Sequence, residues 1–255
     1  WGDPHFKTFD GGRPSIYGDG EFFIVKSTDI VIQGRFKGTP YTKGLAATNK
    51  LAVGGRFLNN HVVEVGCLED GPITLDGSPI LTAFPSSYTL EGGLGSITYS
   101  TQGELVDGAT SKFARHIVHM QLPKNVRLTI LRWDNYADFR LSMPQQPDQD
   151  GGCGNFNDDP SDDTTQALFG RTGARVPDSE LLFRNRLRPE VSSTEAKLLA
   201  TCPAAQMATA KELCPKELAG DAGASEDEAT LRSCYLDICF GSNEHALRMA
   251  EQMGL

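Results

Sequence analysis

The 255-residue chain has no apolar stretch that approaches the roughly eighteen residues needed to cross a bilayer. It also lacks a basic excess, because 24 Lys and Arg residues stand against 33 Asp and Glu residues, which gives a formal net charge of −9. Nucleic acids and anionic membranes attract basic surfaces. We therefore expect a globular protein with no nucleic-acid partner and no membrane insertion.

Motifs that carry catalysis are missing as well. The sequence contains no G-x-S-x-G, no H-E-x-x-H and no phosphate-cradling glycine loop. His116 and His119 lie three residues apart in a segment with strand composition, so their side chains should point to opposite faces and cannot chelate together. We predict that the protein is not an enzyme.

Cysteine is scarce, with six residues, and four of them fall in the last quarter of the chain: Cys202, Cys214, Cys234 and Cys239. Their spacings do not match the paired cysteines of zinc sites, which leaves local disulfide stapling. Disulfides persist in oxidising compartments, so we predict an extracellular, secreted or cell-surface location. No signal peptide is visible at Trp1, and we expect a mature fragment or part of a longer protein.

Residues 1 to about 145 have the composition of short β-strands. The segments rich in aromatic and β-branched residues are 21–26, 29–36, 61–65, 96–100, 115–122, 125–133 and 136–143. Turn pairs such as Asp19-Gly20 and Asp134-Asn135 separate them. This regular spacing is typical of an antiparallel β-sandwich or a barrel-like pair of sheets.

The last third of the chain changes character. Pro177 and Pro189 limit helix formation in residues 164–195, which we predict to be an extended segment that drapes over the sheet. Beyond this segment, apolar residues recur at steps of three and four, as in amphipathic helices. The predicted fold class is mainly β: an antiparallel β-sandwich over 1–170, a linker over 171–195 and a small disulfide-stapled α-helical module over 196–255.

The stretch 151–163, GGCGNFNDDPSDD, concentrates short side chains that carry oxygen: Asn155, Asn157, Asp158, Asp159, Asp162 and Asp163. Such residues are common in solvated loops. They are also the residues from which Ca²⁺ takes its six to eight oxygen ligands. An EF-hand does not fit, because no frame puts Gly at the sixth position and Glu at the twelfth. A calcium ion here needs a further ligand from elsewhere in the chain.

The start of the chain can supply that ligand. Residues 2–11 read GDPHFKTFDG, and together with CGNFNDDPSDD at 153–163 they closely resemble the two motifs of the von Willebrand factor type D domain, in the same order and at a normal separation. The resemblance implies a β-sandwich with one calcium ion at one end. The implied ligands are the side chains of Asp10, Asn155, Asn157, Asp162 and Asp163 and the backbone carbonyl of Asp159.

The C-terminal module offers a second parallel. Type D domains are commonly followed by a cysteine-rich helical module that ends in a C-x₄-C pair, and CYLDIC at 234–239 resembles that pair. The resemblance implies two nested bridges, Cys202–Cys239 and Cys214–Cys234, in a reduced version of the module. Bridges of this kind stabilise a unit with little core, typically by about 2–4 kcal/mol each.

The two remaining cysteines leave two alternatives open. Cys67 and Cys153 either form a bridge with each other, or Cys67 is a buried free thiol.

The Asp3–Pro4 bond also has two interpretations. Some family members that carry GDPH cleave themselves at this bond, so Asp3 and Pro4 are a candidate self-cleavage site. Alternatively, GDPH is simply the first strand, with His5 packing nearby.

The resemblance further implies a mechanical or adhesive role. The chain would be a structural building block of a larger matrix, mucus-like, cell-surface or filament protein, with calcium as a structural cofactor. Its partners would be other protein chains or other domains of the same parent protein. Two alternatives stay open: a domain that cleaves and cross-links itself, and a fragment of a vitellogenin-like lipid carrier.

Overall fold

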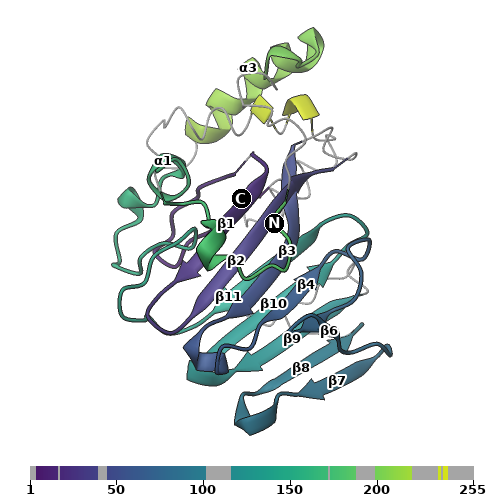
Figure 1. Cartoon of the computed structure of the whole chain (residues 1–255). Coiled ribbons are helices and arrows are strands. Elements are labelled where there is room, and N and C mark those ends of the chain that lie inside the picture. Colours follow the sequence, from purple (N-terminus) through teal and green to yellow (C-terminus); the bar gives the residue numbers. More distant parts are fainter. Residues whose placement is uncertain are drawn as a thin grey trace.

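The computed structural model describes residues 4–16, 18–39, 45–101, 116–171, 173–187, 199–219, 235–236 and 238–240. These residues form two antiparallel sheets with few helices, and the fold is mainly β as the sequence predicted (Figure 1). The helical part lies beside one end of the sheets and contains the Cys202–Cys239 disulfide.

The first sheet has six strands in the order β1-β2-β3-β4-β5-β6. They are β1 (Gly20–Lys26), β2 (Val31–Gly38), β3 (Ala46–Gly54), β4 (Val63–Gly66), β5 (Thr74–Leu75) and β6 (Ser78–Pro79). The second sheet has five strands in the order β11-β10-β9-β8-β7. They are β7 (Ser86–Thr89), β8 (Ser96–Ser100), β9 (Ile117–Leu122), β10 (Val126–Arg132) and β11 (Ala137–Ser142).

Short helical turns occupy the connections: η1 (Arg56–Leu58), η2 (Glu91–Gly93), η3 (Pro123–Asn125), η4 (Pro160–Asp162), α1 (Thr165–Leu168) and η5 (Asp178–Glu180). The longest helix in the described residues is α3 (Ala204–Ala219).

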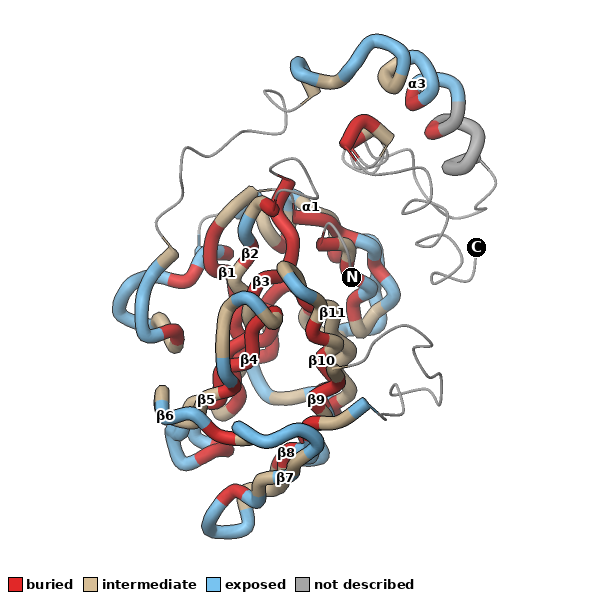
Figure 2. The backbone as a smooth tube through the Cα atoms, turned by 90° about the vertical axis from the view of Figure 1, so that its right-hand side faces the viewer, coloured by how far each residue is buried: buried red, intermediate tan, exposed pale blue. Residues whose placement is uncertain are grey.

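The core fills the space between the two sheets, and Figure 2 shows the buried residues concentrated on the strands. Phe22, Ile24 and Ile32 reach it from the first sheet, and Leu128 and Ile130 reach it from β10 of the second. Alternate residues of a strand point to opposite faces, which is why these positions are separated by two. Burial of this apolar surface is the main force that holds the two sheets together.

Strand β3 was not predicted from the sequence. Its residues AATNKLAVG include a polar centre, Thr48–Lys50, and lack the run of β-branched and aromatic side chains that marks the other long strands. It is nevertheless almost wholly buried, because it lies between β2 and β4. This segment is a strand because it is hydrogen-bonded to β2 and β4 on its two sides, and not because of its own composition.

A buried arginine links the two sheets. Arg132, at the end of β10, is 4% exposed, and its guanidinium donates to the carbonyl oxygens of Gly66 (2.7 Å), Cys67 (3.0 Å) and Gly71 (2.5 Å). It also donates to the Tyr99 hydroxyl at 3.2 Å. These four acceptors replace water around the charge, so the end of β4 is fixed against β8 and β10.

A strap, residues 173–187, lies on the outer face of the first sheet, and residues 188–195 of the predicted linker lie outside the described residues. Gln33 donates from Nε2 to the carbonyl of Glu180 at 2.7 Å and accepts from the N–H of Leu182 at 2.9 Å. Glu21, 2% exposed, receives Arg35 at 3.2 Å, Arg186 at 3.3 Å and the N–H of Leu187 at 2.5 Å. The buried carboxylate is therefore fully paired and holds the end of the strap.

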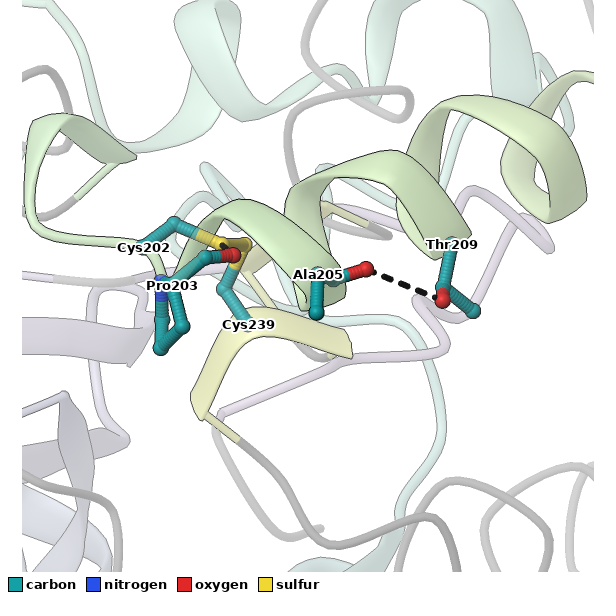
Figure 3. Close-up of a disulfide and its surroundings, with 5 residues drawn as sticks. All are labelled: Cys202, Pro203, Ala205, Thr209 and Cys239. Carbon is teal, nitrogen blue, oxygen red and sulfur yellow. Dashed lines mark hydrogen bonds between the residues drawn. A yellow bond between two sulfur atoms is a disulfide. The ribbon is translucent and has the colours of Figure 1, made fainter.

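The helical module is closed by the Cys202–Cys239 disulfide, one of the two bridges that the resemblance implied (Figure 3). Cys214 is also disulfide-bonded, and its expected partner Cys234 lies outside the described residues. Leu45, which immediately precedes β3, packs in one buried cluster with Leu236, Cys239 and Phe240. The module thus contacts the β-sandwich through a small apolar patch.

The bridge between Cys67 and Cys153 does not form, because both residues are free and buried. Cys153 lies along the edge of β1, where its N–H donates to the carbonyl of Ile24, whereas Cys67 follows β4. Four strand spacings, on the order of 19 Å, separate these positions, and a disulfide requires Cα atoms within about 7 Å. Burial raises the pKa of the Cys153 thiol to about 12, so this thiol stays protonated and unreactive at neutral pH.

Replacing Glu21 by Gln tests the strap. The substitution keeps the shape of the side chain but removes the charge that two arginines share, so the free energy of unfolding should fall by about 1.5–3 kcal/mol. Amide hydrogen exchange in residues 181–187 should accelerate. Glu180→Gln is the matched control, because Glu180 lies in the same strap but pairs with Lys26 in an exposed ion pair, 44% and 45% exposed. It should cost less than about 1 kcal/mol. Equal losses for the two variants would contradict this role of Glu21.

Candidate metal centre

Residues 4–16 form a hairpin that presents Asp10 at its tip. Backbone hydrogen bonds join Phe6 to Pro14 at 2.9 Å and Thr8 to Gly12 at 3.0 Å. At the tip, the Thr8 hydroxyl accepts a hydrogen bond from the N–H of Gly12 at 2.8 Å, and Gly11 takes the positive φ of 95° that the turn needs. The T-F-D-G-G sequence thus folds locally into a turn that exposes the Asp10 carboxylate.

The acidic loop is anchored at both of its ends. Before the loop, the N–H of Gly152 donates to Phe23 of β1 at 2.8 Å, and the carbonyl of Cys153 accepts from Phe9 of the hairpin at 2.9 Å. After the loop, Thr164 caps α1, and Thr165 accepts from the N–H of Ser15 at 3.0 Å. The first sheet, the hairpin and α1 therefore meet around the loop.

The structure brings Asp10 to the loop, as the resemblance implied, and shows how the contact is made. The Asp10 carboxylate accepts from the N–H of Phe156 at 2.9 Å and from the N–H of Asp158 at 2.8 Å. Phe156 and Asp158 both have φ of 63°, in the left-handed region, and their alternate N–H groups converge on one anion. The Phe156 ring stacks on Phe9 with centroids 4.8 Å apart. The loop thus forms a cradle for Asp10.

The amide side chains of the loop are oriented by Asp162. Its Oδ2 accepts from Nδ2 of Asn155 at 3.0 Å and from Nδ2 of Asn157 at 2.8 Å. These contacts turn the two amide oxygens away from Asp162. The Oδ1 of Asn157 accepts from the N–H of Asp159 at 2.8 Å, whereas the buried Oδ1 of Asn155 has no hydrogen-bond partner.

Asp159 caps the short helix η4. Its Oδ1 accepts from the N–H of Ser161 at 2.9 Å and from the Ser161 hydroxyl at 2.6 Å. These hydrogen bonds lower the pKa of the Asp159 carboxyl. The side chain therefore shapes the loop, and its backbone carbonyl is the atom that the resemblance assigns to the ion.

Asp163 is the most deeply buried carboxylate of the loop, at 2% exposed. Neither of its oxygens has a hydrogen-bond partner of ordinary geometry. Burial raises the pKa of the Asp163 carboxyl, and the neighbouring charges of Asp10, Asp162 and Asp159 add to this, although the Thr8 side chain beside it opposes the shift. A buried carboxylate with so few donors is costly unless a positive charge or a proton offsets its negative charge.

Two glycines make room for Asp163. A Cβ on Gly12 would collide with the Cβ of Asp163, and a Cβ on Gly154 would lie 2.7 Å from its Oδ2. These two glycines, together with Thr8 and Phe156, belong to the site but were not predicted from the sequence. The second glycine of T-F-D-G-G is the one signal in the sequence that could have pointed to close packing at the tip.

Three of the five buried side-chain oxygens that lack a hydrogen-bond partner in the described residues belong to this site: Asn155 Oδ1, Asp163 Oδ1 and Asp163 Oδ2. Among the described residues, no three Asp, Glu, His or Cys side chains form a cluster that could hold a metal by themselves. A cation here must therefore also use amide and backbone oxygens. That mixture is the usual ligand set of Ca²⁺.

The candidate self-cleavage site, Asp3–Pro4, lies in the sequence at the start of the hairpin. Asp3 lies outside the described residues, and the structure shows only that Pro4 is buried and that its carbonyl accepts from the N–H of Ile16 at 3.0 Å. His5 lies beside Ser15, with Nδ1 and Oγ 2.9 Å apart.

Comparison with known proteins gives limited support to the resemblance. No family model matches the chain. The chain is 28% identical over 206 residues to SCO-spondin of Gallus gallus, a multidomain protein that contains type D domains. The match covers 77% of this chain but 3% of SCO-spondin, so the chain spans a small fraction of that relative. Separately, no helix among the described residues is both long and apolar enough to cross a membrane.

Substitution of Gly154 by Ala tests the packing around Asp163. Gly154 has φ of 86°, so Ala adds backbone strain as well as a collision with the carboxylate. Gly173→Ala is the control, because Gly173 has φ of 91° and no atom within 4 Å of the added Cβ. We expect Gly154→Ala to lower the free energy of unfolding by about 1–3 kcal/mol more than the control, measured by urea denaturation. Equal losses would show that Asp163 does not pack as described.

Proposed function

We propose that the chain is a non-enzymatic structural or adhesive building block of a larger extracellular, cell-surface or filament protein, stabilised by one structural calcium ion. The observation that carries this proposal is the set of buried acceptor oxygens on Asn155 and Asp163 beside the Asp10 cradle. All three are oxygen acceptors with no hydrogen-bond partner of ordinary geometry, and they lie where two segments far apart in the sequence meet.

The residues present fit calcium. The ion would be held by Asp10, Asn155, Asn157, Asp162, Asp163 and the backbone carbonyl of Asp159. When bound, it supplies positive charge that offsets the buried Asp163 carboxylate and links the hairpin to the loop. Asn157 and Asp162 now bond to neighbouring groups, so they would exchange those hydrogen bonds for the ion. Because the ion binds the folded state, it stabilises that state by RT ln(1 + [L]/Kd).

Two observations support the proposed location. The Cys202–Cys239 disulfide and the similarity to SCO-spondin, a secreted protein, are consistent with an extracellular or secreted protein. Extracellular calcium would keep a site of moderate affinity filled. The partners that suit this role are other protein chains or other domains of the same parent protein.

The two alternative functions receive no support from the structure or the comparisons. Self-cleavage concerns Asp3, which lies outside the described residues. Lipid carriage is not indicated by the core, which side chains of both sheets fill.

Thermal unfolding with excess calcium and with chelator tests the proposal, together with metal analysis of the purified protein. We expect one calcium per chain and a gain of about 2.7 kcal/mol when free calcium is 100 times Kd. Asp163→Ala should lower the melting temperature in calcium and abolish the difference between calcium and chelator. Asp158→Asn is the matched control, because this side chain is exposed, belongs to the same loop and is not an implied ligand. It should leave the calcium response intact.

The result that would overturn the proposal is a wild-type protein that contains no calcium and melts at the same temperature in calcium and in chelator. An equal loss of the calcium response in Asp158→Asn and Asp163→Ala would instead assign the effect to the total charge of the loop.

A further inference from the structure

Asp10 and Asp163 both belong to the implied ligand set, yet their surroundings in the protein differ. Each oxygen of Asp10 receives a backbone N–H, at 2.8 Å and 2.9 Å. Neither oxygen of Asp163 has a hydrogen-bond partner of ordinary geometry, although the side chain is 2% exposed and Thr8 lies beside it. The protein alone supplies hydrogen bonds to both oxygens of Asp10, but it does not do so for Asp163.

We infer that these two carboxylates have opposite effects on the ion-free protein: Asp10 is a positioning residue that holds the acidic loop with or without the ion, and Asp163 is a charge that only the ion makes favourable. The Asp163 half of this inference rests on the proposed function. The Asp10 half rests on the cradle of Phe156 and Asp158 alone.

The cradle does not compete with a cation for Asp10. A carboxylate oxygen has two lone pairs, so each oxygen can accept one N–H and still face an ion. The backbone conformation at Phe156 and Asp158 also indicates that Asp10 holds the loop. A left-handed φ is unfavourable for a side chain as bulky as Phe, so the conformation of Phe156 needs an external contact to hold it. Asp10 provides that contact on the backbone, and Phe9 provides it on the Phe156 ring.

Around Asp163, nearby negative charges outweigh hydrogen-bond donors, in contrast to Asp10. Its neighbours are Gly12 and Gly154, which bring the backbone close without directing a donor at the carboxylate, and the charges of Asp10 and Asp162 lie nearby. Removing the negative charge of Asp163 should therefore relieve the ion-free protein. Removing that of Asp10 should damage it, because an amide in place of the carboxylate would direct an NH₂ group at a backbone N–H.

The test compares Asp10→Asn and Asp163→Asn in chelator and in excess calcium. In chelator, the melting temperature should rise by several degrees in Asp163→Asn and fall by several degrees in Asp10→Asn. In calcium, both variants should melt below the wild type, because each removes a ligand charge. Glu91→Gln, which removes an exposed carboxylate in η2 outside the loop, should match the wild type in chelator to within about a degree and respond to calcium.

Amide hydrogen exchange supplies a readout that general destabilisation would not give. In chelator, at a temperature where all variants are folded, the N–H groups of Phe156 and Asp158 should exchange faster in Asp10→Asn and at the wild-type rate in Asp163→Asn. The inference is overturned if both variants shift the melting temperature in chelator in the same direction, or if the two amides exchange equally in both. A wild type that ignores calcium would overturn the proposed function, while the chelator comparison would still decide the role of Asp10.

Discussion

The N–H groups of Phe156 and Asp158 donate hydrogen bonds to Asp10. These bonds span sequence separations of 146 and 148 residues. Much of the end of the sandwich depends on this contact. It holds the 4–16 hairpin over the edge of β1, where Phe6 joins the aromatic side chains of Phe36, Phe139 and Phe169. Because Phe36 and Phe139 belong to different sheets, the position of the hairpin also affects how the sandwich closes.

Buried polar groups recur at the points where irregular segments meet the sheets. Glu21 and Gln33 hold the strap on the first sheet, and Arg132 fixes the turn after β4. In each case the polar side chain binds backbone groups that have no strand to pair with, so it performs locally the role that a neighbouring strand performs elsewhere. Asp163 is the exception among these buried polar groups, and that contrast is the physical basis for proposing an ion beside it.

Part of this structure could be predicted from the sequence for clear physical reasons. Long strands such as β1 and β10 are visible because β-branched and aromatic residues dominate them, and the Cys202–Cys239 pairing could be read from a resemblance. Strand β3 could not be predicted, because its burial comes from β2 and β4 rather than from its own composition. The same holds at the site: the acidic loop was evident from residue type and Asp10 was implied by the resemblance, whereas the cradle and the space that Gly12 and Gly154 leave depend on tertiary packing.

The disulfide of the helical module also affects how the chain would carry force. Cys202 and Cys239 are 37 residues apart in the sequence, and their sulfur atoms are directly bonded. Tension applied on either side of the module would pass through this covalent bond and bypass the segment between the two cysteines. At about 3.3–3.6 Å per residue, that segment represents on the order of 120 Å of chain that could not be pulled out without reduction. Extension under load would therefore depend on the redox state of the surroundings as well as on the applied force.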